Sequence, residues 1–192
     1  MPEGLVTTLA EAVRTLVRPR DHLHFASLPY RSNAGILAIS AAFHGTDPQF
    51  VISTSGFHST AHLLPALGLG RRYIASFFGD NYPTPRPNPL YDALDQRGEL
   101  EIWSLLSLVM ALRAGALGLP FAVTRSLVDT DLGVELAAAN RVRFAADPFG
   151  GTDEVALVAP LRPDLTLVHA HLGDADGNLL IAPAGCEGAW GA

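Results

Sequence analysis

The sequence predicts an α/β fold with an open, mainly parallel sheet that helices cover on both faces. Short apolar runs typical of buried strands alternate with helical patterns along the chain, and this alternation favours a parallel sheet. Apolar residues make up 48% of the chain and charged residues 17%, which favours a globular protein over a disordered one. Because no internal repeat or linker is found, we expect one domain over residues 1–192.

The first half of the chain is expected to contain three strands with helices between them. An amphipathic helix is predicted by apolar residues that recur every four positions, namely Leu5, Leu9, Val13 and Val17. The strands are expected at 22–28, 49–54 and 71–78, and two further helices at 34–43 and 60–70. Pro65 bends or shortens the last of these helices, and four prolines make residues 79–89 a loop.

The second half is expected to continue the alternation and to end in two closing strands. A short helix precedes a strand, a longer helix and another strand, at 89–98, 99–105, 107–118 and 119–126. A long polar loop with Gly150 and Gly151 then leads to strands at 154–160 and 163–172. Gly115 and Gly118 are expected to end their helix and to permit close packing. Glu101 and Glu154 begin strands and are expected at the surface.

Charge and composition exclude several classes of function. A net charge of −6 argues against a surface that binds nucleic acid or anionic membranes. All 13 basic residues are arginine, so neither a lysine Schiff base nor a P-loop lysine is available. The single cysteine, Cys186, permits no internal disulfide, and a reducing, cytoplasmic setting fits best. We find no signal peptide and no apolar stretch long enough to span a bilayer.

Two pairs of histidines raise the question of a metal site. His169 and His171 are expected on one face of a strand, and His22 and His24 repeat the spacing in the first strand. A catalytic zinc site usually takes three protein ligands and a structural one four. Histidines that pack in the core or face a partner subunit are therefore favoured, and we expect no metal.

The segment DADGN at 174–178 resembles the start of a calcium-binding loop only out of register. Its glycine precedes the asparagine, and no glutamate stands at position twelve, where such a loop needs its bidentate ligand. A turn is the better interpretation, with Gly177 and Asn178 reversing the chain before a strand that begins at Leu179.

The loop at 27–35 follows the first predicted strand and is a candidate ligand site. In parallel α/β sheets this end of a strand carries ligand chemistry, because backbone N–H groups at the helix start bind anions. Arg31 could hold a carboxylate or phosphate by two hydrogen bonds, and Ser32 or Asn33 is a natural helix cap. An ordinary cap beside a solvated arginine is the alternative.

The segment at 55–60 occupies the equivalent place after the second strand. Ser55, His58 and Ser59 are polar groups at its end, but the nucleophile elbow of a hydrolase is absent. Helix capping by Ser59 or Thr60 is the simplest role. A glycine-rich run at 68–72 follows a helix and precedes a strand, whereas a dinucleotide-binding fingerprint needs the reverse order.

Taken together, these segments resemble family I coenzyme A transferases, specifically the α-type subunit typified by glutaconate CoA-transferase. The resemblance is carried by LRAGALGLPF at 112–121, by the segment from DPFGG to GDADGN at 147–178, and by the strand, loop and helix at 22–43. No single motif decides it, but their order and spacing do.

The resemblance implies an open α/β CoA-transferase fold and an acyl-CoA thioester as substrate, with no bound cofactor. In that family a glutamate of the β-type half attacks the thioester and forms covalent intermediates, which is nucleophilic catalysis by a carboxylate. The nucleophile is therefore expected on a partner chain, in a hetero-oligomer. This chain is expected to contact the substrate through Ser27, Tyr30, Arg31, Ser32, Asn33, Ser55 and His58.

Three departures from the family pattern leave other functions open. The first loop reads ASLPYRSN instead of a glycine-rich run, and no carboxylate lies between Glu101 and Asp129, where a ring-cleaving hydrolase branch places an acid. The chain also stops at Ala192, where the family continues, so we expect an obligate complex with a companion chain. The alternatives are a hydrolase, C–C lyase or cyclase without CoA transfer, or a non-catalytic scaffolding subunit. A glutamate in an E-N-G or E-x-G context on the companion would favour transfer.

Overall fold

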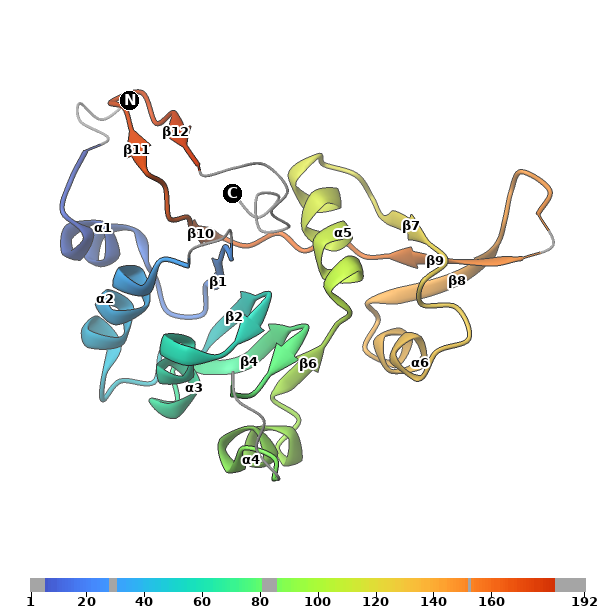
Figure 1. Ribbon diagram of the computed structural model, residues 1–192, viewed down its shortest axis with the longest axis horizontal. Helices are drawn as coiled ribbons and strands as arrows, with labels where there is room; N and C mark the ends of the chain where they lie inside the picture. The colour runs from blue at the N-terminus through green and yellow to red at the C-terminus, as the bar shows by residue number, and fades with distance from the viewer. Residues whose placement is uncertain (1–5, 28–30, 81–85, 152, 182–192) are drawn as a thin grey trace.

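A five-stranded parallel sheet forms the centre of the protein (Figure 1). The computed structural model describes residues 6–27, 31–80, 86–151 and 153–181. The strand order is β10-β1-β2-β4-β6, and all four pairings are parallel. The strands span His22–Phe25 (β1), Phe50–Thr54 (β2), Gly70–Ala75 (β4), Leu100–Ile102 (β6) and Leu165–Leu167 (β10). The predicted parallel sheet is confirmed.

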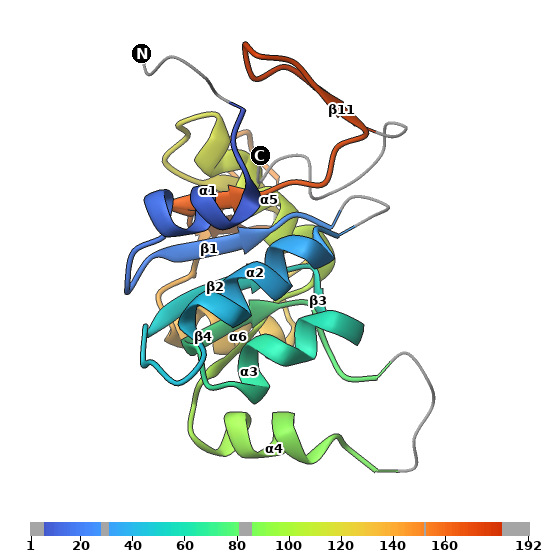
Figure 2. The same ribbon diagram turned by 90° about the vertical axis from the view of Figure 1, so that its left-hand side faces the viewer.

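Helices cover both faces of this sheet, as the alternation predicts. In Figure 2 the helices α1 (Leu9–Leu16), α2 (Asn33–Phe43) and α3 (Leu63–Ala66) lie in front of β1, β2 and β4. They share one apolar core with α4 (Pro89–Gln96). The opposite face packs in a second core, against α5 (Leu105–Ala116). No helix in the described ranges is long and apolar enough to cross a bilayer.

The strands distribute their side chains between these two cores by simple alternation. Leu23, Phe25 and Ile52 are fully buried in the core that contains α1 and α2. Because successive side chains on a strand point to opposite faces, His24 and Ser53 lie on the face that α5 covers. They are directly paired across β1 and β2. The sheet therefore turns a polar strip toward α5.

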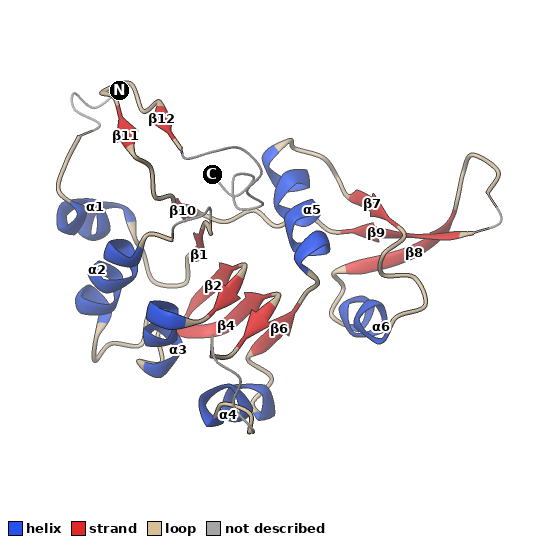
Figure 3. Ribbon diagram, viewed as in Figure 1, coloured by secondary structure: helices blue, strands red, loops and turns tan. Residues whose placement is uncertain are grey.

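A second, antiparallel sheet lies beside α5 (Figure 3). It has the order β7-β9-β8, with bounds Ala122–Thr124 (β7), Val142–Ala146 (β8) and Glu154–Val158 (β9). The strands predicted at 119–126 and 154–160 exist, but they belong to this sheet and not to the parallel one. Antiparallel and parallel strands of this length carry similar apolar runs, so periodicity alone does not separate them.

The polar loop predicted between residues 126 and 150 is wrong. It contains the helix α6 (Asp131–Ala138) and the strand β8. Thr130 caps this helix by accepting a hydrogen bond from the backbone N–H of Gly133 (3.0 Å). Gly133 is a poor helix former, and it concealed the helix, yet Leu127 and Leu136 on either side of it are buried in the second core.

The strand predicted at 163–172 is shorter than expected. Only Leu165–Leu167 pairs with β1, and His169 and His171 lie beyond it, both exposed and outside any strand. The chain then forms a hairpin from β11 (Leu172–Gly173) and β12 (Leu179–Leu180). The apolar run predicted too long a strand because its second half leaves the sheet and is not buried.

The turn predicted at 174–178 is confirmed. Gly177 has a φ of +86°, which is the left-handed region that favours glycine. The Oδ1 atom of Asp174 accepts hydrogen bonds from the backbone N–H groups of Asp176 (3.0 Å) and Asn178 (2.8 Å). The hydrogen bonds of Asn178 in particular lower the pKa of Asp174. The acids in this segment therefore build a turn.

Two further expectations concern packing on α5 and β6. Gly115 approaches the chain so closely that a Cβ atom there would lie 2.0 Å from the carbonyl oxygen of Leu161, and Gly118 follows the helix with a φ of +66°. Their predicted roles are confirmed. Glu154 is exposed as expected, but the surface position predicted for Glu101 is wrong, because this side chain is only 6% exposed.

Glu101 is buried because it joins the two sheets. Arg141, directly before β8, donates Nε to Oε1 (2.8 Å) and Nη2 to Oε2 (3.1 Å) of Glu101. Arg72 on β4 donates to Oε2 (2.7 Å), and the indole N–H of Trp103 donates to Oε1 (2.9 Å). Burial alone would raise the pKa of Glu101, but these partners, Arg141 above all, hold it below its usual range.

Candidate functional site

The carboxyl ends of β1 and β2 lie side by side, and the two candidate loops leave the sheet there. Beyond Ser55 and Ser76 the chain continues as two short parallel strands, β3 (Gly56–Phe57) and β5 (Phe77–Phe78). Both the backbone N–H and the hydroxyl of Ser76 donate to the carbonyl oxygen of Ser55, at 3.1 and 2.6 Å. The structure therefore brings together the loops predicted from the sequence.

Arg31 connects these two loops. Its Nη2 donates to the carbonyl oxygen of Gly56 (2.7 Å), its Nη1 to that of His58 (3.1 Å), and its Nε to the hydroxyl of Ser27 (3.3 Å). Nη2 also lies 3.0 Å from Nε2 of His58. Burial and the charge of Arg31 lower the pKa of His58, so its neutral ring accepts this hydrogen bond. The arginine predicted to meet a ligand is thus held by the protein's own loops.

The other predicted site residues take different places around this connection. Ser27 shares a hydrogen bond with Thr54 (3.0 Å). Ser32 caps α2 by accepting from the backbone N–H of Gly35 (3.2 Å), which confirms one of the two caps considered, and Asn33 is the first residue of that helix. Tyr30 lies outside the described residues.

The capping role considered for Ser59 or Thr60 is wrong. The short 3-10 helix η1 (Ser59–His62) begins after His58, and no side chain hydrogen bond caps it. Ser59 itself is the first residue of the turn and has a φ of +53°, a conformation that costs a non-glycine residue about 1 kcal/mol or more. No local pattern indicates this strain, which lies next to the contacts of His58.

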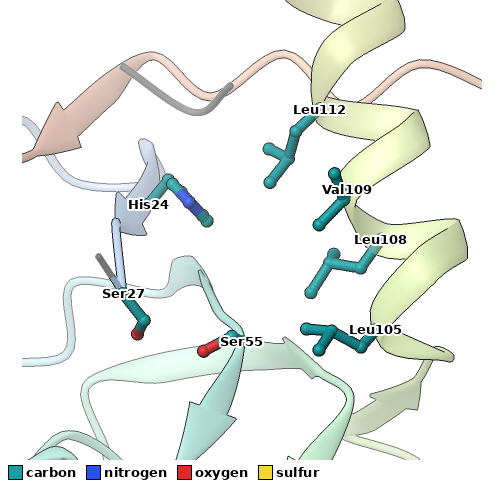
Figure 4. Close-up of a pocket in the computed structure, with 7 residues that line it drawn as sticks. All are labelled: His24, Ser27, Ser55, Leu105, Leu108, Val109 and Leu112. Carbon is teal, nitrogen blue, oxygen red and sulfur yellow. The ribbon is translucent and has the colours of Figure 1, made fainter. Parts of the chain in front are cut away.

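A pocket opens between the polar strip of the sheet and α5 (Figure 4). One wall is polar and consists of His24, Ser27 and Ser55. The other is the apolar face of α5, with Leu105, Leu108, Val109 and Leu112. The space measures about 210 Å³ when the open solvent at its mouth is included, and it has room for about one water molecule between the side chains. Ser27 and Ser55, both predicted site residues, thus line this pocket, and neither of them is charged.

His24 is the pocket residue that sequence reasoning missed. The ring is 1% exposed, and its Nδ1 lies 2.9 Å from the hydroxyl of Ser53, which also lies 2.8 Å from Nε2 of His22. Burial lowers the pKa of His24 to about 4, and the adjacent His22 contributes. Burial likewise lowers the pKa of His22 to about 4, against the opposing effect of Asp164. The signal was the H-L-H spacing at 22–24, which raised only the question of metal binding.

The described residues of the site do not form a metal centre. In the part of the chain that the structure describes, no group of three or more His, Cys, Asp or Glu side chains is placed to hold a metal ion. His22 and His24 are directed to the same serine hydroxyl. The site therefore offers neutral hydrogen-bonding groups beside an apolar wall.

Comparison with known proteins connects this arrangement to one family. The family model described as coenzyme A transferase matches residues 6–192. A 3-oxoadipate CoA-transferase subunit from Pseudomonas knackmussii is 33% identical over 123 residues, which cover 62% of this chain and 42% of that protein. An uncharacterized protein from Archaeoglobus fulgidus is 33% identical over 87 residues, covering 44% of this chain and 18% of that protein. The chain thus spans less than half the length of these relatives.

Solved structures share the fold at lower identity. Glutaconate coenzyme A-transferase from Acidaminococcus fermentans has a TM-score of 0.77 and 20% identity, covering 94% of this chain and 61% of that one. The decarboxylase AibA/AibB has a TM-score of 0.74 and 24% identity, with coverage of 95% and 68%. An acyl-CoA transferase from Escherichia coli O157:H7, in a thioester complex with CoA, has a TM-score of 0.73 and 14% identity, with coverage of 93% and 37%.

These similarities agree with the parallel sheet and its helices, and the resemblance seen in the sequence is confirmed. Because the family model matches nearly the whole chain, the protein belongs to the coenzyme A transferase family.

Proposed function

We propose that this chain is the α-type subunit of an enzyme that acts on an acyl-CoA or related thioester, with a β-type companion that supplies the nucleophilic glutamate. The observation that carries the proposal is the composition of the pocket. The pocket lies at the carboxyl edge of the sheet, where parallel α/β proteins bind ligands, and the described residues that line it include no carboxylate.

The buried acid nearest in sequence to the pocket wall does not fit the role of nucleophile. Glu101 accepts hydrogen bonds from Arg72, Arg141 and Trp103, so its oxygens are occupied and its charge is neutralised. A carboxylate attacks best when it is not held by two guanidinium groups, which lower its basicity. The glutamate that the family chemistry needs would therefore come from another chain, in a hetero-oligomer.

The part proposed for this chain is to bind the acyl end of the substrate. The face of α5 offers four aliphatic side chains for a carbon chain. Contact with them would stabilise the bound acyl chain by about 25 cal/mol for each Å² of apolar surface buried. Ser27 and Ser55 add hydroxyls on the facing wall. Arg31 keeps the loops that carry these serines in register through its contacts with Gly56 and His58.

Co-production of this chain with its companion tests the proposal. If the two chains co-purify, labelled CoA should exchange into an acyl-CoA pool with both chains present and not with either alone. A Glu→Gln substitution of the companion's candidate nucleophile should abolish the exchange, because an amide does not attack the thioester. Product formation without any CoA exchange would contradict the transferase assignment.

Two observations favour a second candidate, a lyase or hydrolase of the same fold. The loop at 27–35 carries side chains where the family has a glycine-rich run, and the α5 wall of the pocket is wholly apolar. The decarboxylase AibA/AibB has the same fold. Release of CO₂ or free CoA from an acyl-CoA, with no labelled CoA returned to thioester, would identify this alternative.

A further inference from the structure

His24 has a buried ring nitrogen that no protein group satisfies. The ring is 1% exposed, and its Nε2 is one of two buried side-chain polar atoms without a hydrogen-bond partner among the described residues. The other is the hydroxyl of Ser40. A buried polar atom left unpaired costs about 1 to 3 kcal/mol. We therefore expect a bound molecule to supply the hydrogen-bond partner of this nitrogen.

The unpaired nitrogen belongs to the wall of the pocket. In Figure 4 the ring of His24 extends from β1 toward α5, with Ser27 and Ser55 below it. Its other nitrogen, Nδ1, is occupied by Ser53 on the neighbouring strand. Any partner for Nε2 must therefore enter through the pocket. The pocket as a whole has room for about one water molecule, which matches a single atom such as an oxygen, so the carbon that bears this oxygen must reach it from the solvent-open side.

Ser53 links the tautomers of the two histidines. Its hydroxyl has one hydrogen and lies between Nε2 of His22 (2.8 Å) and Nδ1 of His24 (2.9 Å). When Ser53 donates to His22, it accepts from Nδ1–H of His24, and Nε2 of His24 is an acceptor. When Ser53 donates to His24, Nε2 of His24 carries the hydrogen and is a donor. The pair can thus offer either polarity without a change in net charge.

We propose that Nε2 of His24 binds an uncharged oxygen, a hydroxyl or a carbonyl, on the short acyl chain of the substrate, while the aliphatic side chains of α5 contact its carbons. The proposal rests on the assignment of the pocket to an acyl thioester, and it names the substrate class. His24 is a specificity-determining residue in this scheme, and Ser53 is the positioning residue that selects donor or acceptor.

The charge of the site favours a neutral group over a carboxylate. No arginine is among the described residues that line the pocket, and the guanidinium of Arg31, in the adjoining loop, donates to Ser27, Gly56 and His58. Both histidines are neutral at pH 7, since burial lowers their pKa values to about 4. An ionised group at this position would lose its water without gaining a counterion, which is costly.

Two substitutions separate the ring nitrogens. In His24→Asn the side-chain amide reaches the position of Nδ1 and can keep the bond to Ser53, but nothing remains at Nε2. In His24→Gln the amide reaches the position of Nε2. Ser40→Ala is the matched control, because it removes the other unpaired buried atom and Ser40 lies on α2, which does not line the pocket.

The experiment compares butyryl-CoA with 3-hydroxybutyryl-, 4-hydroxybutyryl- and acetoacetyl-CoA on the complex of both chains. The unaltered complex should prefer at least one oxygen-bearing thioester by roughly tenfold in kcat/KM, as expected for one buried hydrogen bond. His24→Asn should lose this preference, whereas His24→Gln should keep part of it and Ser40→Ala all of it. A preference that survives in His24→Asn, or that is absent from the unaltered complex, would overturn the proposal.

A second readout does not depend on turnover. With ¹⁵N-labelled histidine, the ring nitrogens of His24 are observed by NMR and assigned by their loss in His24→Asn. Saturating 3- or 4-hydroxybutyrate should shift the Nε2 signal, and butyrate should not. A shift without CoA chemistry would keep the binding of an oxygen at Nε2 but reject the proposed function. CoA chemistry with an unmoved Nε2 signal would mean that a water molecule alone occupies the nitrogen, and the inference would fail.

Discussion

The Nη2 atom of Arg31 lies 2.7 Å from the carbonyl oxygen of Gly56, so a side chain from the loop after β1 holds the backbone that follows β2. This contact gives Arg31 a structural role. A side chain expected to be solvated or to meet an anion instead fixes the distance between two loops of the site.

Substitution of Arg31 should disturb the loops more than the sheet. Arg31→Ala removes the donors to Gly56 and His58, and Arg31→Lys should not replace them, since a lysine lacks the planar fork of guanidinium. We expect activity of the complex to fall at least tenfold with both variants, with a loss of stability of only about 1 to 2 kcal/mol. Arg71→Ala, at an exposed position of β4, is the control. Full activity in Arg31→Ala would show that the connection is dispensable.

Stability should fall on mild acidification. The pKa values of His22 and His24 are lowered to about 4 in the folded protein, against about 6.5 in the unfolded chain. Between these values the unfolded state binds more protons, so stability is fully present above pH 6.5 and is lost as the pH falls toward 4. Each histidine contributes up to about 1.4 kcal/mol per pH unit there. Urea unfolding at several pH values measures this slope, and His24→Gln should make it shallower. An unchanged slope would argue against a neutral, buried His24.

Removal of the carboxylate of Glu101 should weaken the connection between the two sheets and lower the free energy of unfolding. Glu101→Gln leaves Arg72 and Arg141 facing each other without their anion, and we expect a loss of about 2 to 4 kcal/mol. The lower part of that range reflects the partial exposure of the arginines, 39% for Arg72 and 28% for Arg141. The matched control is Glu154→Gln, at an exposed strand start, which should change stability by less than about 0.5 kcal/mol. Equal midpoints in urea for both variants would refute the structural role of Glu101.

A methyl group at Gly115 should not be tolerated. The new Cβ atom would lie 2.0 Å from the carbonyl oxygen of Leu161, and because this atom belongs to the backbone, the helix and the segment after β9 must move apart. We expect Gly115→Ala to cost about 2 kcal/mol or more, although alanine favours helix by about 1 kcal/mol. Ala116→Gly, at the exposed next position, should lose only that propensity. Thermal unfolding of the two variants makes the comparison, and a gain in stability for Gly115→Ala would contradict the close approach.

Local patterns predict the parallel sheet but not its junction with the antiparallel sheet. Strands such as β1 and β2 carry apolar side chains that are buried in the core. Their own residues are therefore enough to identify them as strands. Glu101 carries a charge that sequence reasoning places in solvent, and its burial depends on Arg141, which lies 40 residues later. The helix α6 was missed for a related reason, since Gly133 weakens its pattern while burial of Leu136 stabilises it.

The candidate site was predictable in position and not in composition. The loops after β1 and β2 follow from the topology of a parallel sheet, and Ser27 and Ser55 do line a pocket. The role of His24 depends on which strand lies beside β1 and on the helix that covers it. The neighbouring strand contributes Ser53 and the covering helix is α5. Both lie too far from His24 in the sequence for a local pattern to reveal the contact.

The pairing of β1 has a consequence for how the protein is made. One neighbour of β1 is β2, which follows within about 30 residues, but the other neighbour is β10. Directly before β10, the carboxylate of Asp164 accepts a hydrogen bond from the backbone N–H of His22, and these two residues are 142 positions apart in the chain. At a synthesis rate of about 5 to 20 residues per second, β1 waits roughly 7 to 30 s on the ribosome for its second partner. During that interval the nascent chain exposes an unpaired strand edge, so this sheet is completed only after β10 has been synthesised.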